Sequence, residues 1–332
     1  MRRFLVCLLV ACVILGAITY VAFNVSPWPS AMIVRLLFDW RARATAEALD
    51  KYVPKDVIAR LDEQYDASDR DAKLDIYYPA RAEGSREVLP TVVWVHGGAW
   101  VSGDKSHIAN YLKILAGHGY TTVGVNYSLA PEKIYPTPVK QVNAALAYLA
   151  RDASRFHVDG SKFFLAGDSA GSQIAAQLAN AISVVSYASR IGVVPSIERS
   201  HLRGVVLYCG AYDISQVDLS GAFSGFLRAV LWSYTGTKDF MGDPRLTPAS
   251  VARFVTPAFP PMFISGGNGD PLTPQSREMA EAVARQGVYV DSLFYPMDYK
   301  PALPHEYQFD LDTAAGQTAL ERSLRFLAEQ SR

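Results

Sequence analysis

The sequence has few cysteines and no excess of charge of either sign. Of its three cysteines, Cys7 and Cys12 lie in an N-terminal apolar segment, so Cys209 is alone in the rest of the 332 residues. A lone cysteine excludes both a disulfide framework and a cysteine-based metal site in that part of the chain. The 32 basic residues balance the 32 acidic ones, and no run of Lys or Arg stands out. The sequence therefore carries no electrostatic signature of nucleic-acid binding, and we find no internal repeat or low-complexity segment.

Charge is also missing from one long stretch near the N-terminus. Phe4–Phe23 contains no charged residue, and the uncharged stretch continues to Val34. Twenty helical residues span roughly 30 Å, the thickness of the hydrocarbon core of a bilayer. We therefore expect residues 1–25 to form an uncleaved membrane anchor. A cleaved signal peptide is the second interpretation, and a lipoprotein signal ending at Cys12 is the third.

Basic residues flank this stretch on both sides. Arg2 and Arg3 precede it and favour an N-terminus inside the cell, with the main domain outside. Arg35, Arg41 and Arg43 on the other flank oppose that orientation. We therefore expect a membrane-anchored protein whose main domain lies outside the cytoplasm, on the periplasmic or extracellular side.

Residues 26–56 are expected to be a helical linker or cap element. Pro27 and Pro29 end the anchor, and Ala31–Leu49 then reads as an amphipathic helix. This helix could cap a functional site, lie on the membrane surface, or simply pack on the main domain. Its apolar residues at helical spacing are Ile33, Leu36, Leu37 and Trp40.

From Val57 onward, short apolar runs alternate with segments of helical pattern. Strands that alternate with helices imply an α/β fold, with a mostly parallel sheet and helices on both faces. Half of the residues are apolar, enough for one sizeable core, and no linker divides residues 57–332, so we expect a single domain. Ser215–Pro260 shows no clean strand and is the candidate for a small cap. A hairpin of Val57–Leu61 and Leu74–Tyr78 is followed by strands at Thr91–Val95, Thr121–Asn126, Phe163–Ala166, Gly204–Tyr208, Pro261–Ser265 and Val288–Tyr295, with helices at Ile108–Ala116, Pro138–Ala150, Ser172–Ile182, Arg277–Arg285 and Thr313–Ala328.

One segment joins an apolar strand to a helical pattern through a glycine-rich turn. Gly167-Asp168-Ser169-Ala170-Gly171 follows the apolar run Phe163–Ala166 and precedes a helix. The pattern G-x-S-x-G between a strand and a helix is typical of a nucleophile elbow, a turn so tight that only glycine fits on either side of the serine. It places the serine hydroxyl at a helix N-terminus, where a developing negative charge is favoured. Ser169 is therefore the candidate nucleophile.

A serine hydroxyl needs a base that takes its proton and an acid that orients the base. His305 lies in a loop between the last strand and the last helix, on the edge where open α/β sheets form their sites. Asp270 follows the strand Pro261–Ser265, and Asp213 holds an equivalent place one strand earlier. The order Ser169, Asp270, His305 is that of the α/β-hydrolases, so Asp270 is preferred and Asp213 is the rival. The other histidines are expected at the surface (His107, His118, His157, His201) or in a structural role (His96).

Backbone N–H groups must also stabilise the oxyanion of a tetrahedral intermediate. Gly97 and Gly98 follow the strand Thr91–Val95 and have no Cβ to block an approach. Ala170, just after the candidate nucleophile, offers a third N–H group. These three residues are the predicted oxyanion hole.

Taken together, these segments resemble α/β-hydrolases of the esterase/lipase group related to hormone-sensitive lipase. The resemblance runs from about Val57 to the C-terminus. It implies that Ser169 is the nucleophile, Asp270 the acid and His305 the base, with Gly97, Gly98 and Ala170 in the oxyanion hole. The matching segments are His96-Gly97-Gly98-Ala99-Trp100, Tyr127-Ser128-Leu129-Ala130-Pro131-Glu132, Gly167-Asp168-Ser169-Ala170-Gly171, Asp270-Pro271-Leu272 and His305.

Two positions depart from the pattern of that group. Ser128 stands where the group usually has arginine, which puts a structural ion pair in doubt. Ala99 replaces the third glycine of the loop after His96, which can alter acyl or alcohol preference. The membrane anchor is also unusual for the group.

The resemblance implies a serine carboxylesterase that cleaves short- to medium-chain esters through an acyl-enzyme, with no metal or organic cofactor. An amide hydrolase such as an arylformamidase or peptidase, and a lipase, are alternatives with the same triad. A non-catalytic binding protein on this fold is a further alternative, disfavoured because all three triad residues are present. The sequence names neither the ester nor the oligomeric state.

Overall fold

A single eight-stranded sheet forms the centre of the protein. The computed structural model describes residues 2–221 and 223–332. The strand order is β1-β2-β4-β3-β5-β6-β7-β8. β1 and β2 pair antiparallel, as do β2 and β4, and all other pairs are parallel. The predicted α/β fold and its N-terminal hairpin are confirmed. The strands are β1 (Val57–Gln64), β2 (Lys73–Pro79), β3 (Leu89–Val95), β4 (Thr121–Val125), β5 (Val158–Asp168), β6 (Leu202–Tyr208), β7 (Met262–Gly266) and β8 (Val290–Phe294).

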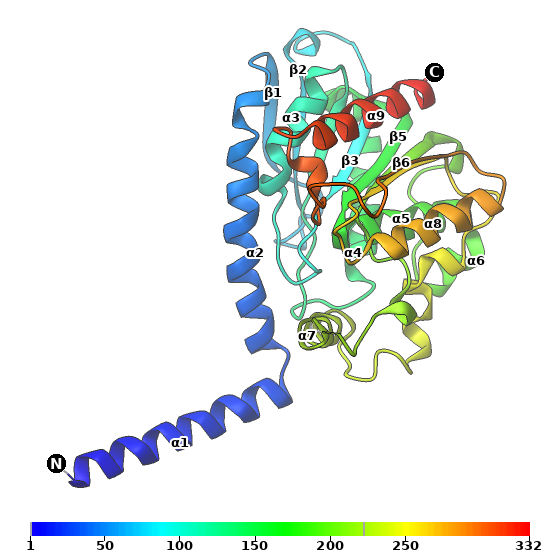
Figure 1. Cartoon of the computed structure of the whole chain (residues 1–332). Coiled ribbons are helices and arrows are strands. Elements are labelled where there is room, and N and C mark those ends of the chain that lie inside the picture. The colour runs from blue at the N-terminus through cyan, green and yellow to red at the C-terminus, as the bar shows by residue number, and fades with distance from the viewer. Residues whose placement is uncertain (1, 222) are drawn as a thin grey trace.

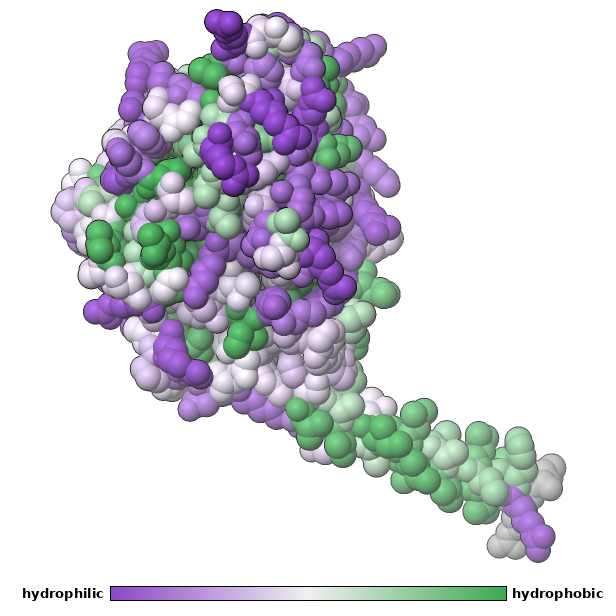
Figure 2. Space-filling model, turned by 180° about the vertical axis from the view of Figure 1, so that it is seen from behind, coloured by the Kyte–Doolittle hydropathy of each residue, from purple (hydrophilic) through white to green (hydrophobic). Residues whose placement is uncertain are grey.

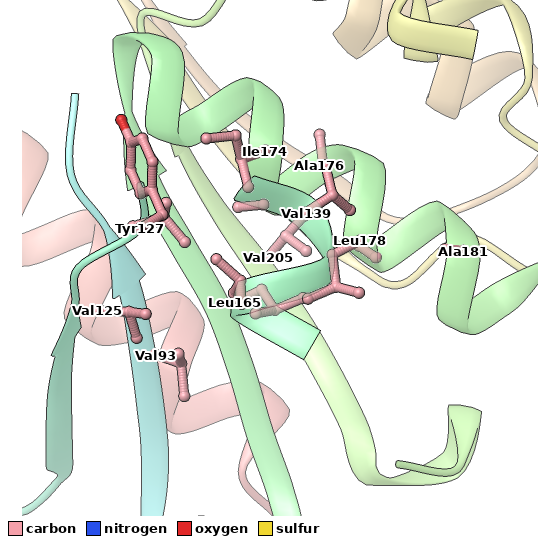
Figure 3. Close-up of a cluster of buried hydrophobic side chains, with 14 of the residues drawn as sticks. Val93, Val125, Tyr127, Val139, Leu165, Ile174, Ala176, Leu178, Ala181 and Val205 are labelled. Atoms are coloured by element: carbon pink, nitrogen blue, oxygen red, sulfur yellow. The ribbon is translucent and has the colours of Figure 1, made fainter. Parts of the chain in front are cut away.

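Helices cover both faces of the sheet because both faces of its strands are apolar. Val92 and Trp94 of β3 belong to one buried cluster, and Val93 and Val95 belong to the other, as the period of two along a strand requires. The first cluster is closed by α3 (Ala109–Gly117) and α9 (Ala314–Gln330). The second is closed by α4 (Thr137–Arg151), α5 (Ser169–Ser183), α6 (Val185–Arg190) and α8 (Thr273–Arg285). Figure 3 shows part of the second cluster, to which Leu165 of β5 and Ile174 of α5 both belong.

The predicted elements are found with shifted ends, and two helices were not predicted. α5 begins at Ser169 itself, three residues before the predicted start. α6 and α7 (Ser224–Thr235) were missed, α7 lying inside the segment predicted only as a cap. The prediction that His157 lies at the surface is wrong. This side chain is buried, its Nδ1 lies 2.9 Å from the carbonyl of Glu87, and its ring packs on Tyr78.

Two N-terminal helices precede the sheet. α1 (Arg2–Val25) extends away from the rest of the molecule, and α2 (Trp28–Ala48) runs along one side of it (Figure 1). α1 is exposed almost throughout and forms a continuous apolar rod (Figure 2). It is the one helix among the described residues that is long and apolar enough to cross a membrane, a test that a signal sequence also passes. The amphipathic helix predicted from Ala31 begins slightly earlier, at Trp28, because Pro29 is accepted in a first helical turn.

Candidate active site

A sharp turn between β5 and α5 presents Ser169. β5 ends at Asp168 and α5 begins at Ser169, whose φ of 50° lies in the left-handed region. A Cβ on Gly171 would lie 2.0 Å from the carbonyl oxygen of Val95, and one on Gly167 would lie 2.6 Å from the backbone of Gly171. Both positions therefore require glycine, as the elbow pattern predicts. The strained φ of Ser169 is held by the strand and helix on either side.

His305 and Asp270 lie beside Ser169, although they are far apart in the sequence. His305 Nε2 lies 3.0 Å from Ser169 Oγ, and His305 Nδ1 lies 3.0 Å from Asp270 Oδ2. The Asp270 side chain is buried, and its other oxygen accepts a hydrogen bond from the N–H of Leu272. The loops after β7 and β8 thus bring an acid and an imidazole into one hydrogen-bonded row with the serine.

Asp213, the rival acid, is engaged elsewhere. One of its oxygens accepts from the N–H and the hydroxyl of Ser215, and the other accepts from Arg253 Nε at 2.7 Å. Burial alone would raise the pKa of Asp213, but these hydrogen bonds and one from Ser250 outweigh burial and lower it. Its carboxylate is therefore a structural ion-pair partner, and the structure places Asp270, not Asp213, against His305.

The surroundings of His305 favour its protonated form. Burial by itself would lower its pKa, but Cys209, the hydrogen bond to Asp270 and the nearby Glu306 outweigh burial and raise the pKa well above the usual 6.5. Burial raises the pKa of the Cys209 thiol to about 11, so that thiol is uncharged at neutral pH and acts on His305 as a hydrogen-bond partner rather than as a charge. Asp270 is then the neighbouring charge that most directly stabilises an imidazolium. This is the arrangement expected of an acid that supports a base.

The three predicted oxyanion donors are placed differently from one another. The N–H of Gly97 donates to Asp168 Oδ2 at 2.8 Å, so it is already engaged. The N–H groups of Gly98 and Ala170 have no hydrogen-bond partner among the described residues. Asp168 also accepts from Trp94 Nε1 at 2.7 Å, and its carboxyl therefore fixes the start of the loop rather than meeting a substrate.

Asp168 and Glu306 form a carboxyl pair that the sequence did not reveal. Burial and the neighbouring charge of Glu306 raise the pKa of Asp168 well above its usual value, although Trp94 and Gly97 donate to it. Glu306 also lies 3.7 Å from His305 Nε2. The position of Asp168 inside G-x-S-x-G was visible in the sequence, but its partner, 138 positions away in the chain, was not.

The loop after β3 is braced from behind by aromatic and polar groups. His96 stacks on Tyr127 with ring centroids 4.4 Å apart, and the Tyr127 hydroxyl donates to the carbonyl of His96. Burial lowers the pKa of His96 to about 4, so it is neutral and structural, as predicted. Ser128, in the position of the missing arginine, instead donates to Asp71 and accepts from Gln141.

A residue of α2 forms an ion pair with the segment that contains Ser128. Arg35 forms a two-pronged ion pair with Glu132, and the same guanidinium donates to the carbonyls of Val101 and Ala130. Burial would raise the pKa of Glu132, but the hydrogen bond from Arg35 outweighs burial and lowers it. Arg35 therefore fixes α2 to the loop beside the site, and no sequence pattern indicated this pairing across 97 positions.

A cavity of about 150 Å³ lies between α2 and the turn that carries Ser169. The wall formed by α2 includes Phe38, Arg41 and Ala42, and the opposite wall includes Gly98 and Ser169. One group of possible metal ligands also occurs among the described residues, formed by Cys209, Asp270 and His305 with donor atoms within 4.8 Å of one another. Two of its members are hydrogen-bonded to each other and the third is a neutral thiol, so the group is better described as part of the Ser169 site.

The twisted sheet, the turn at Ser169 and the loops that bring His305 and Asp270 to it define an α/β-hydrolase of the hormone-sensitive-lipase-like group. Residues 74–283, well over half of the chain, match the BD-FAE family, and the chain belongs to that family.

Solved structures of esterases share this fold over nearly the whole chain. Esterase B from Lactobacillus rhamnosis, inhibited by a C6-C4 SN3 compound, is 25% identical, with 92% of this chain and 97% of that chain covered and a TM-score of 0.77. A bacterial heroin esterase is 21% identical, with 90% and 91% covered and a TM-score of 0.70. A hyperthermophilic esterase from the archaeon Pyrobaculum calidifontis is 21% identical, with 95% and 96% covered and a TM-score of 0.69.

Proposed function

We propose that the protein is a serine carboxylesterase with Ser169, His305 and Asp270 as its catalytic triad. The observation that carries this proposal is the hydrogen-bonded row, with 3.0 Å between Ser169 Oγ and His305 Nε2 and 3.0 Å between His305 Nδ1 and Asp270 Oδ2. Neutral His305 takes the hydroxyl proton as Ser169 Oγ attacks the ester carbonyl. His305 then gives that proton to the leaving alcohol, and an acyl-enzyme remains. Water activated by His305 releases the acid and restores the serine.

The oxyanion formed in each half-reaction is stabilised by N–H groups at the start of α5 and in the loop after β3. Because Gly97 already donates to Asp168, we assign the role to Gly98 and Ala170 and give Gly97 a supporting role. One such donor contributes about 3–4 kcal/mol to transition-state stabilisation. Asp168 holds the loop in place for this purpose through Gly97.

Short- to medium-chain esters are the substrates that we propose. The related esterase B has been solved with a tributyrin phosphonate, and the cavity beside Ser169 measures about 150 Å³. A cavity of that size holds a molecule of about the size of benzene. We further propose that residues 1–25 anchor the protein, that residues 26–56 cover the catalytic domain of residues 57–332, and that this domain is extracytoplasmic.

The triad assignment is tested by a fluorophosphonate, which labels an activated serine. Ser169→Ala abolishes both labelling and ester turnover, because no other hydroxyl among the described residues is hydrogen-bonded to His305. Ser183→Ala, at the other end of α5, is the matched control and keeps both, since Ser183 Oγ only donates to the carbonyl of Ala179. Labelling that persists on another serine in the Ser169→Ala protein would contradict the assignment of Ser169 as the nucleophile.

A further inference from the structure

The outward face of α2 carries an exposed apolar stripe. Six large apolar side chains lie on it at helical spacing, and the side chains of Leu36 and Trp40 are 75% and 77% exposed. Residues four apart lie above one another on a helix, so these side chains form one continuous face over three turns. The members of this stripe are Trp28, Met32, Ile33, Leu36, Leu37 and Trp40.

The inward face of the same helix is already occupied. Ala31 and Val34 are buried against the rest of the molecule, and Phe38 packs on Phe226 of α7 with ring centroids 5.7 Å apart. Arg35 fixes the helix through its ion pair with Glu132. The outward stripe is therefore not needed to attach α2, and a helix that is apolar on both sides is normally buried on both sides.

The chain length between α1 and α2 restricts what can cover the stripe. α1 ends at Val25 and α2 begins at Trp28, so two residues join them and reach at most about 7 Å. If α1 spans a bilayer, the first turn of α2 lies at its surface. α1 also leaves the molecule on the side along which α2 runs (Figure 1), and Lys238, close after α7, donates to the carbonyl of Asn24 in the last turn of α1.

The chemistry of the stripe suits a lipid surface. Tryptophan is enriched where the hydrocarbon of a bilayer meets its headgroups, and Trp28 and Trp40 stand at the two ends of the stripe. The next turn of α2 carries two exposed arginines, Arg41 and Arg43. Arg41 lines the cavity at Ser169, whereas Arg43 is not part of that cavity and has no ion-pair partner among the described residues. Apolar side chains followed by free basic groups are typical of helices that lie in the interface plane.

We propose that α2 lies flat on a lipid bilayer, with its stripe in the interfacial region and Arg43 near lipid phosphates. This inference rests on the proposed membrane anchoring by α1. Because the inner side of α2 lines the cavity that contains Ser169, the arrangement brings the active site next to the lipid. The substrates it favours are esters with a short acyl group and an apolar alcohol that partitions into the bilayer.

The position of the stripe is measured on the full chain reconstituted in vesicles of phosphatidylcholine and phosphatidylglycerol. In a Cys7→Ser, Cys12→Ser background, Cys209 is fully buried and does not react. A polarity-sensitive dye is attached after Leu36→Cys and, as the matched control, after Val185→Cys on α6, which is 81% exposed. The dye at position 36 shifts to the blue and is quenched by lipids that carry a quencher, whereas the dye at position 185 keeps its emission in water.

The same vesicles separate the possible failures. Loss of flotation with the vesicles would contradict the anchor, and loss of turnover of soluble p-nitrophenyl acetate would contradict the proposed activity. Flotation and turnover with a dye at position 36 that stays in water would overturn the present inference alone. A dye that is shielded but not quenched by lipid would indicate a second protein copy on the stripe and would overturn it equally.

A second variant tests the consequence for substrate delivery. Leu36→Gln with Trp40→Gln lowers, several-fold, the rate on the butyryl ester of a long-chain alcohol held in the vesicles, and leaves the rate on p-nitrophenyl acetate unchanged. Val185→Gln changes neither rate. Equal rates on the vesicle-held ester for the double variant and its parent would contradict the delivery role.

Discussion

At the scale of single residues, the surroundings of Asp213 and Asp270 distinguish two acids that the sequence left as rival partners of His305. Asp213 and Asp270 both follow a strand at the same edge of the sheet, yet Asp213 pairs with Arg253 while Asp270 contacts His305. The chain order and the segment Asp270-Pro271-Leu272 favoured Asp270, and the hydrogen bonds of Asp213 supply the physical reason. Neither the engagement of Gly97 by Asp168 nor the Asp168–Glu306 pair could be predicted, because each depends on the fold of a loop rather than on a pattern.

Replacing the two acids gives opposite results. Asp270→Asn lowers kcat about 10⁴-fold, because an amide cannot hold His305 in the required tautomer or stabilise its cation. Asp213→Asn keeps turnover near that of the parent and instead lowers the melting temperature, since it weakens the pair with Arg253 and the bonds to Ser215. Initial rates and thermal melts of the two variants measure this, and a larger loss of turnover in Asp213→Asn would reverse the assignment.

The raised pKa of His305 sets the acid side of the pH profile. The base acts only when neutral, so kcat/KM falls as the pH drops through the folded pKa, and the midpoint lies above about 6.5. The same shift stabilises the fold fully below about pH 6.5, and this stabilisation is lost as the pH rises through the folded pKa.

The cause of this shift is measurable apart from turnover. An NMR titration of His305 in Ser169→Ala gives the pKa directly, and adding Asp270→Asn lowers it because the neighbouring carboxylate is lost. A midpoint at or below pH 6.5, or no change on adding Asp270→Asn, would show that Asp270 is not the charge that stabilises the imidazolium.

At the scale of the elements, the central strands β3, β5, β6 and β7 could be predicted because each contains an uninterrupted apolar run, as strands buried on both faces do. α7 could not, because Ser224–Thr235 is rich in small and aromatic residues and owes its helix to tertiary packing, including the stack of Tyr234 on Trp100. The attachment of α2 was equally hidden. Its amphipathic pattern predicted a helix. However, the side chain that attaches it, Arg35, pairs with Glu132, 97 positions further along the chain.

The junction of β5 and α5 is the least tolerant part of the fold. Gly171→Ala destabilises the protein by about 3 kcal/mol or more, because its Cβ would lie 2.0 Å from the carbonyl oxygen of Val95 and neither backbone segment can move freely. Gly225→Ala in α7 is the control, since no atom of the described residues lies within 4 Å of a Cβ built there. It stabilises the protein by about 0.5–1 kcal/mol. Chemical denaturation measures the free energy of unfolding of both variants. Similar values for Gly171→Ala and Gly225→Ala would refute the tight packing at the junction of β5 and α5.

At the scale of the whole molecule, the apolar N-terminus and the catalytic domain meet at α2. One side of this helix forms a wall of the cavity at Ser169, and its other side carries the exposed stripe. The sequence predicted a helix here and left open whether it caps the site, lies on a membrane or simply packs on the main domain. In the structure, covering the site and lying on a membrane are compatible, because the first uses the inner face of α2 and the second its outer face.

The size of the cavity predicts how the rate depends on acyl length. Each methylene that finds an apolar wall adds roughly 0.8 kcal/mol of binding, but a cavity of about 150 Å³ under α2 receives few of them. We expect kcat/KM for soluble p-nitrophenyl esters to peak between the acetyl and octanoyl chains and then to decline. Removing the side chain of Phe38 from the α2 wall enlarges the cavity, so Phe38→Ala moves the peak to longer chains, whereas Val185→Ala on the far side leaves it in place. A rate that climbs steadily to the palmitoyl ester would contradict the limit on acyl length that the small cavity predicts. The protein would then be a lipase, because long acyl chains would have to bind along the face of α2 that meets the lipid.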